Sequence, residues 1–175
     1  MLIETIFLII FTAFHASTAT EPYYWRTYNG SIPEDAVLTE DENTFVGRVT
    51  VRTDAINYYP ATIDAEAKTA TTAVNGKKWV GKDLHNIMIL CTSEPSRLQW
   101  KYVHIYAVQG SFLRNIVWGG YYNDVYRYVG KVFHDNKWKI STVYENGHKL
   151  AGLNIWSNLN GNGFTVNDFQ ILMYD

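Results

Sequence analysis

The chain has 175 residues, of which 47% are hydrophobic and 18% charged, a balance typical of a globular protein and not of a disordered one. Its 15 basic and 17 acidic residues give a net charge of −2 and form no basic cluster, which argues against binding to nucleic acid or to an anionic membrane. Aromatic residues make up 15% of the chain, and such residues favour β-strands and ligand-binding surfaces.

The beginning of the chain resembles a targeting segment. Residues 2–14 are apolar apart from Glu4 and two threonines, and this run is too short for a transmembrane helix. Ser17-Thr18-Ala19 follows with the spacing of a cleavage site. We expect residues 1–19 to be a signal peptide, although no Lys or Arg precedes the apolar run, and a buried N-terminal helix is the alternative. A secreted, extracellular protein without a transmembrane segment is therefore predicted.

The first part of the expected mature chain contains a glycosylation sequon and an acidic loop. The sequon Asn29-Gly30-Ser31 lies in a turn-like context, so Asn29 is a candidate N-glycosylation site. Glu40, Asp41 and Glu42 precede a strand predicted at 45–52 from alternating Val and Thr. Asp41 and Glu42 are candidate ligand-binding residues that could accept hydrogen bonds from hydroxyls or hold a cation weakly; a solvated acidic loop is the alternative.

The middle of the first half is ambiguous between helix and strand. Tyr58-Tyr59-Pro60 interrupts the strand pattern, and residues 64–68 have helical propensity, whereas residues 69–74 are rich in β-formers. Asn75-Gly76 then lies between two β-like runs, and Asn-Gly accepts the positive φ angles of a two-residue hairpin turn. We therefore predict strands here, and a further strand at 87–91 closes the first half.

Cys91 is the single cysteine of the chain. A secreted protein with one cysteine has no internal disulfide, and a buried thiol that packs as a small apolar side chain is expected. An intermolecular disulfide is the alternative, and the sequence is also compatible with a homodimer.

The second half begins after a short linker at 93–96, whose length suits one compact body better than two free domains. A long strand is predicted at 98–108 from its aromatic alternation. A glycine- and aromatic-rich loop follows at 117–124. The remaining predicted elements are strands at 125–133, 138–145, 148–153 and 165–174, with Asn146-Gly147 as a second hairpin turn and a polar turn at 158–163.

One short motif occurs twice and organises the chain. Phe45-Val46-Gly47-Arg48-Val49 and Tyr128-Val129-Gly130-Lys131-Val132 each read aromatic, Val, Gly, cation, Val, and the landmarks around them are separated by 80 to 83 residues. We infer two tandem repeats, at residues 20–92 and 93–175, that form one folded domain. The fold class expected is all-β: a single compact antiparallel β domain of two pseudo-symmetric repeats, neither of which could bury its sheet face alone.

The loop at 117–124 is the strongest candidate binding site. Sugar recognition uses an aromatic face for the apolar side of the ring and amide or carboxylate groups for the hydroxyls, and glycines allow close approach. The alternative is that Trp118 and one tyrosine belong to the core. The candidate ligand-binding residues here are Trp118, Tyr121, Tyr122, Asn123 and Asp124.

Other chemistries find little support in the sequence. It contains no metal-binding, nucleotide-binding or hydrolase motif, and its five histidines are scattered, so we expect no cofactor, no metal and no enzymatic activity. Arg48 and Lys131, which follow the repeated glycines, could donate to a ligand or protect a sheet edge.

The order of these motifs resembles the DM-nine repeat family of insects and molluscs. NGSIPEDAV, FVGRV, Pro-Ala, Asn-Gly and NIMIL follow one another in the first half, and the second half keeps the Gly-Gly loop and YVGK. The resemblance covers residues 25–175. It places the family's acidic sugar-binding position at Asp41 or Glu42 and near residues 122–124, and it places Thr62 and Thr142 where the family has a sugar-binding lysine.

The resemblance implies a compact β fold with a non-enzymatic role. Members of the family include mannose-binding lectins of innate immunity, salivary or gut proteins, and the lectin-like half of natterin toxins. Two functions are therefore expected: a secreted carbohydrate-binding, lectin-like recognition protein whose partner is a glycan, such as one of the mannose type, or a secreted protein-interaction module with a degenerate sugar site.

Overall fold

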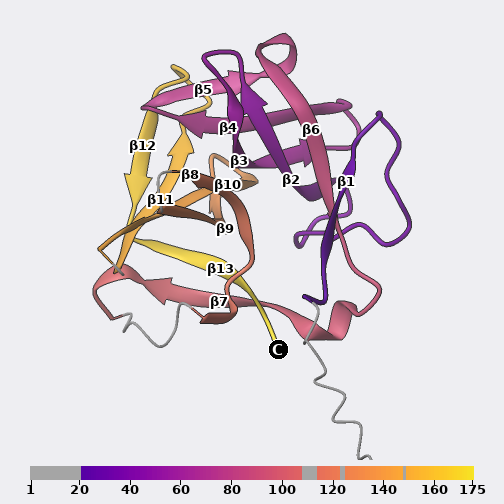
Figure 1. The fold of residues 1–175 in the computed structure, drawn as a ribbon. Helices are drawn as coiled ribbons and strands as arrows, with labels where there is room; N and C mark the ends of the chain where they lie inside the picture. Colours follow the sequence, from indigo (N-terminus) through magenta and orange to yellow (C-terminus); the bar gives the residue numbers. More distant parts are fainter. Residues whose placement is uncertain (1–20, 108–113, 123–124, 148) are drawn as a thin grey trace, which may run out of the picture.

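The computed structural model describes residues 21–107, 114–122, 125–147 and 149–175, and it consists of two antiparallel β-sheets (Figure 1). Each sheet is built from one half of the chain. The all-β prediction is confirmed, and the helical residues belong to short 3-10 turns, among them Gly81–Asp83, Pro95–Arg97 and Ile105–Ala107. No helix in the described ranges is long enough and apolar enough to cross a bilayer.

The first sheet contains six strands, and their order across the sheet departs from their order in the chain because the last strand inserts beside the second. In spatial order the strands are β1 (Tyr24–Thr27), β6 (Leu84–Cys91), β2 (Thr44–Val51), β3 (Asp54–Asp64), β4 (Thr69–Val74) and β5 (Lys77–Val80).

The second sheet contains seven strands. In spatial order six of them are β7 (Leu98–His104), β13 (Asp168–Tyr174), β9 (Val125–His134), β10 (Lys137–Asn146), β11 (Lys149–Trp156) and β12 (Gly163–Val166), and β8 (Trp118–Tyr122) also pairs with β9.

The two sheets connect their strands in the same order. In each half the first strand pairs with the last, the last with the strand that carries the repeated motif, and three strands follow in sequence. The segments before the motif also match: the Val37 amide donates to Leu90 at 2.9 Å, and the Val117 amide donates to Leu172 at 2.9 Å. This correspondence is what a tandem repeat predicts, whereas an overall two-fold pseudo-symmetry and the repeat boundaries stay predictions.

The repeated glycines are required by packing within each sheet. A Cβ atom on Gly47 would lie 2.7 Å from two side-chain carbons of Ile63, and one on Gly130 would lie 2.4 Å from Cγ2 of Val143. Real Cβ contacts are longer than this, so any side chain at either position would displace a fully buried neighbour. The motif therefore keeps its glycine for a steric reason.

Three clusters of buried side chains form the core. One belongs to each sheet, and the third, which draws on both, contains Tyr23, Val46, Leu90, Val117, Val129, Ile140 and Leu172. Burial of one such aliphatic side chain stabilises a protein by about 1.5–3 kcal/mol, so either half on its own would lose this contribution. Cys91 is buried in the first cluster as a free thiol, as predicted.

Two further contacts join the halves. Near the middle of the molecule, where β3 and β10 cross (Figure 1), the Thr62 hydroxyl donates to the Ile140 carbonyl at 3.0 Å and accepts from the Ile140 amide at 2.7 Å. At one end, the β4–β5 hairpin contacts the start of β12 and the segment before it: the Gly163 amide donates to the Gly76 carbonyl at 2.8 Å, and the Lys78 amide donates to the Gly161 carbonyl at 3.0 Å.

Residues near the two ends of the described chain are in contact. The ring centroids of Tyr23 and Tyr174 are 5.5 Å apart, and the Asp175 amide donates to the Arg97 carbonyl at 3.1 Å. The two ends of residues 21–175 therefore lie close together.

Four local predictions were wrong. Tyr58-Tyr59-Pro60 does not interrupt a strand, because Pro60 lies inside β3 opposite Arg48 and its carbonyl accepts from the Thr72 hydroxyl at 2.7 Å. The strand predicted at 98–108 ends at His104, the last strand divides into β12 and β13, and residues 118–122 form a strand where a loop was expected. Pairing with β9 accounts for that last difference.

Candidate functional site

A polar groove with a volume of about 560 Å³ lies between the two halves. The first half provides mainly hydroxyls and carboxylates, whereas the second half provides two indoles, two lysines and two amides. Its lining residues are Asp41, Thr44, Thr62, Asp64, Thr69, Thr71, Lys78, Val80, Asn136, Lys137, Trp138, Lys139, Trp156 and Asn158.

The hydroxyl-rich side of the groove follows from strand register. Successive side chains of a strand point to opposite faces, so alternate residues of β3 and β4 share one face. Thr62 pairs with Thr71 and Asp64 with Thr69, and Asp64 also pairs with Thr44 of β2. Three adjacent strands thus present one face of threonine and aspartate to the groove.

The two groove carboxylates are held in place by the backbone. Asp41 Oδ1 accepts from the Asn43 amide at 3.1 Å, and Asp64 Oδ1 accepts from the Ala67 amide at 2.9 Å. Each carboxylate can accept several hydrogen bonds, so lone pairs are left for hydroxyls of a ligand.

The aromatic side of the groove is formed by Trp138 and Trp156. Trp156 is almost fully buried, whereas Trp138 is half-buried and packs edge-on against Phe133 with ring centroids 5.5 Å apart. The ammonium of Lys78 lies 6.0 Å from the centroid of the Trp156 ring. Trp138 is therefore the more accessible of the two indoles and gives the groove apolar surface that the threonine-lined wall lacks.

An ion pair between a buried lysine and a half-exposed glutamate lies next to Trp138. The Lys131 side chain is fully buried, and its ammonium is 4.4 Å from the Trp100 ring centroid and 4.6 Å from that of Trp138. Burial lowers the pKa of Lys131, and a 2.8 Å hydrogen bond to Glu40 of the acidic loop opposes that shift. Glu40 therefore ties the acidic loop of the first half to β9 of the second.

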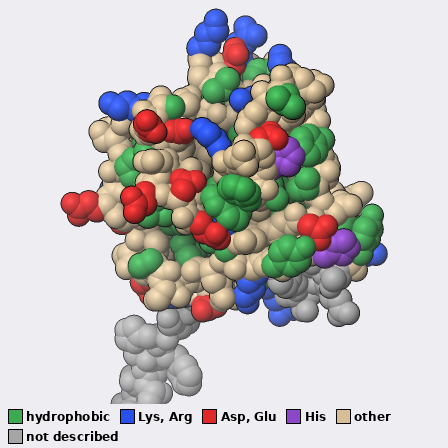
Figure 2. Space-filling view, turned by 180° about the vertical axis from the view of Figure 1, so that it is seen from behind, with side chains coloured by type: hydrophobic (Ala, Val, Ile, Leu, Met, Phe, Trp, Pro, Cys, Tyr) green, Lys and Arg blue, Asp and Glu red, His purple; other side chains and the backbone are tan. Residues whose placement is uncertain are grey.

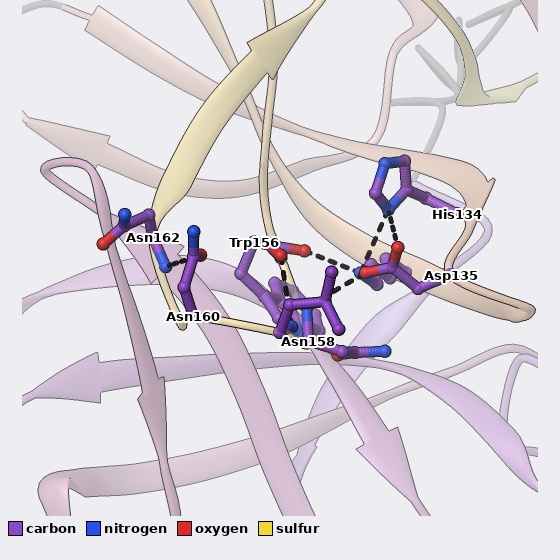
Figure 3. Close-up of polar contacts among 9 residues, drawn as sticks. His134, Asp135, Trp156, Asn158, Asn160 and Asn162 are labelled. Carbon is purple, nitrogen blue, oxygen red and sulfur yellow. Dashed lines mark hydrogen bonds and ion pairs between the residues drawn. The ribbon is translucent and has the colours of Figure 1, made fainter.

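A second network lies behind Trp156 (Figure 3). Lys139, only 1% exposed, donates to Asp135 Oδ2 at 2.8 Å and to the Trp156 carbonyl at 2.6 Å. Asp135 Oδ2 also accepts from the Asn158 amide at 2.9 Å. The hydrogen bond from Lys139, together with that from Asn158, holds the pKa of Asp135 at about 2.

The predicted ligand-binding residues do not form one site in the structure. Asp41 lines the groove, whereas Glu42 is exposed on the same loop and is not part of the lining. Trp118 lines a separate hollow of about 310 Å³ with Tyr126 and Tyr128. The Tyr121 ring packs against Tyr126 with centroids 5.0 Å apart.

The remaining predicted positions have mixed outcomes. Tyr122 ends β8, while Asn123 and Asp124 lie outside the described residues. Asn29 is exposed, and its Oδ1 accepts from the Ser31 amide at 3.1 Å. Arg48 does not protect a sheet edge, because β2 lies between β3 and β6, and Lys131 lies on the equally internal β9.

The aromatic half of the groove was missed by the sequence reasoning. A signal was present in Asp135-Asn136, which separates two β-like runs and has positive φ angles of 55° and 58°, as a two-residue hairpin turn requires. This turn would have joined the strands predicted at 125–133 and 138–145 in a hairpin, with Trp138 close to the turn. Nothing in the sequence pairs Trp138 with Trp156.

Across the described ranges, no group of three His, Cys, Asp or Glu side chains is arranged to hold a metal ion. Comparison of the sequence with protein-family models and with curated proteins finds no match in either case.

Proposed function

We propose that this protein is a secreted, lectin-like recognition protein and that the groove between its halves binds carbohydrate. The observation that carries the proposal is the combination of Trp138 and Trp156 with the backbone-held carboxylates of Asp41 and Asp64 on one groove. A pyranose has an apolar face that packs on an aromatic ring and equatorial hydroxyls that hydrogen-bond to carboxylates and other polar groups.

The charges of the groove favour an uncharged sugar. Lys139 is neutralised by Asp135, which leaves the cations Lys78 and Lys137 and the anions Asp41 and Asp64. An acidic or an amino sugar would meet an opposite and a like charge together, whereas the hydroxyls of a neutral hexose can use donors and acceptors of both kinds.

The sequence resemblance to DM-nine repeat lectins supports the same proposal. It places the family's acidic position at Asp41 or Glu42 and its lysine position at Thr62, and Asp41 and Thr62 are both groove residues. A role in innate immunity or in salivary or gut secretion, with mannose-type glycans as ligands, is the corresponding biological proposal.

A second candidate function is a protein-interaction module that uses the aromatic cluster around Tyr126. The rings of Tyr121 and Tyr128 lie 5.0 and 6.0 Å from that of Tyr126, and Tyr121 and Tyr126 are exposed. Protein-binding sites usually present a contiguous apolar patch. On the one face shown in Figure 2, hydrophobic side chains form separate groups among polar atoms and acidic residues.

A glycan array probed with the protein lacking residues 1–19 tests the first proposal. We expect binding to neutral glycans, with hexose-rich glycans above sialylated or sulfated ones. Absence of binding to every glycan by folded protein, with the fold checked by circular dichroism, would contradict the proposal. Preference for anionic glycans would contradict the inferred charge balance. Unchanged glycan after long incubation is the expected result for a binding protein that is not an enzyme.

A further inference from the structure

The lysine behind Trp156 holds the groove wall and is not available to a ligand. An ammonium group has three N–H donors. Lys139 donates to Asp135 Oδ2 at 2.8 Å and to the Trp156 carbonyl at 2.6 Å, and its Nζ lies 3.3 Å from His134 Nδ1, which accepts the third hydrogen bond in the tautomer with its lone pair on that atom. A buried ammonium with all its donors used is a structural group, so Lys139 acts on the groove through its neighbours.

Those neighbours include two residues of the groove wall. Lys139 donates a hydrogen bond to the Trp156 carbonyl. Asp135 accepts hydrogen bonds both from Lys139 and, at 2.9 Å, from the backbone amide of Asn158. Trp156 and Asn158 both line the groove. The turn between β9 and β10 thereby fixes the end of β11 and the residues after it, although the two segments are about twenty residues apart in the chain.

His134 faces two groups with opposite requirements. Its Nδ1 lies 3.3 Å from the ammonium of Lys139, which can only donate, and 3.1 Å from Asp135 Oδ1, which can only accept. A neutral imidazole with its lone pair on Nδ1 accepts from Lys139. A protonated imidazole instead donates to Asp135 and offers Lys139 no acceptor. The two arrangements exclude each other.

Among the described residues, Asp135 provides the carboxylate that forms an ion pair with His134. Lys137 is its partner across the β9–β10 ladder, and β12 contributes the uncharged ring of Phe164, with ring centroids 5.2 Å apart. Protonation therefore adds a positive charge beside Lys139 and opposite Lys137, with Asp135 as the one carboxylate in contact. Histidine is the side chain that gains this charge between about pH 8 and 5.

We propose that Asp135 and Lys139 are positioning residues for the groove wall at Trp156 and Asn158, and that protonation of His134 releases this wall. Lys139 then loses an acceptor and shares Asp135 with a second cation. The consequence for ligand affinity rests on the proposed function, whereas the movement of the wall does not.

NMR of the ligand-free protein tests the movement. We expect the backbone amide of Asn158 and the indole N–H of Trp156 to shift with the same pH midpoint as the imidazole of His134. In His134→Asn, whose amide oxygen can accept from Lys139 without titrating, both shifts should disappear. His134→Gln is the second variant if His134→Asn does not fold. In His104→Asn, which removes an exposed histidine paired with Asp168 at 2.8 Å, both shifts should persist.

The outcomes are distinct. Signals of Asn158 and Trp156 that stay fixed while His134 titrates, or that shift equally in His134→Asn, would overturn the proposal.

With the strongest neutral glycan from the array, affinity should fall about three- to tenfold from about pH 7.5 to pH 5.5, as expected for one lost hydrogen bond, and the fall should be absent in His134→Asn. A glycan that binds with equal affinity at about pH 7.5 and pH 5.5 would also overturn the proposal. A protein that binds no glycan but shows the NMR shifts would contradict the proposed function alone.

Discussion

Arg48 and Lys131 occupy equivalent positions in the two sheets, and each cation lies between two aromatic rings. The Arg48 guanidinium is 4.6 Å from the Trp25 ring centroid and 4.4 Å from that of Tyr58. The Lys131 ammonium has the same relationship to two tryptophans. The repeated cation therefore stabilises the fold, since such contacts contribute about 0.5–2 kcal/mol each.

The ion pair of Lys131 predicts an asymmetry between two variants. Glu40→Gln leaves a buried ammonium without its carboxylate and should lower the free energy of unfolding by roughly 1–2 kcal/mol. Lys131→Met loses the two ring contacts but also removes the desolvation cost of the buried ammonium, so it should cost less than the ring contacts alone would suggest. Urea denaturation measures both. Glu42→Gln, an exposed carboxylate on the same loop, is the control and should have no effect. Equal stability of the Glu40 and Glu42 variants would refute the structural role of the pair.

The repeated glycines predict a steric effect with a specific rescue. Gly130→Ala should destabilise the protein by about 1–3 kcal/mol, because the new Cβ would lie 2.4 Å from Cγ2 of Val143. Val143→Ala removes that methyl group and should restore part of the loss in the double variant, which a double-mutant cycle of unfolding free energies detects. Strictly additive effects would show that the crowding lies elsewhere.

Two neighbouring carboxylates of the acidic loop should affect glycan binding differently. Asp41→Asn should weaken binding of the glycan selected on the array by about tenfold, the effect of a lost charged hydrogen bond, whereas Glu42→Gln should bind normally because Glu42 does not line the groove. Trp138→Ala and Trp118→Ala form a second matched pair, of which only the first removes a groove indole. Isothermal titration calorimetry distinguishes them. Loss of binding in Trp118→Ala alone would move the site to the hollow near Tyr126.

Buried tyrosines predict alkaline unfolding. Burial raises the pKa of Tyr59 and Tyr128, and hydrogen bonds donated to Asp54 and Glu145 add to this effect. Above about pH 10, where an unfolded tyrosine ionises, the native state binds more protons than the unfolded state, so stability falls as pH rises. Urea unfolding between about pH 9 and 11 should show this loss, with a shallower slope in Tyr128→Phe. An unchanged slope in that variant would contradict the assignment.

Asn29 provides a test of secretion. Expression of residues 1–175 in a eukaryotic secretory system should yield protein in the medium that begins near Thr20 and carries an N-linked glycan, because the sequon lies on an exposed turn. Mass spectrometry of the wild type and of Asn29→Gln measures both features. Retention of residues 1–19 in the exported protein would exclude cleavage at the predicted site.

Local patterns predicted most strands because they are set by near neighbours. The Asn75-Gly76 turn has the positive φ angles of 51° and 70° that its sequence requires, and β4 and β5 follow on either side. Pro60 was misjudged because its strand role depends on partners that local reading does not identify: Arg48 opposite it and the Thr72 hydroxyl on its carbonyl.

The groove could be predicted only in part, since its two walls come from different halves of the chain. Asp41 stood out as an acidic residue next to a strand, but Trp138 and Trp156 resemble ordinary core tryptophans until β10 and β11 are placed beside β4. Trp118 and Tyr121 looked like a sugar-binding loop because glycines and aromatic residues surround them. Gly120 is instead required for packing, since a Cβ there would lie 2.0 Å from the Tyr58 carbonyl oxygen.

The contact between Tyr23 and Tyr174 has a consequence for engineering. The two ends of the described chain lie close together, and residues 93–96 of the linker are exposed. A short peptide can therefore connect the two ends, and new termini can be opened at Ser93. Such a circular permutant would be synthesised with the present C-terminal sheet first. It should reach the same native structure, so the order in which the two sheets leave the ribosome is not part of the information that specifies the fold.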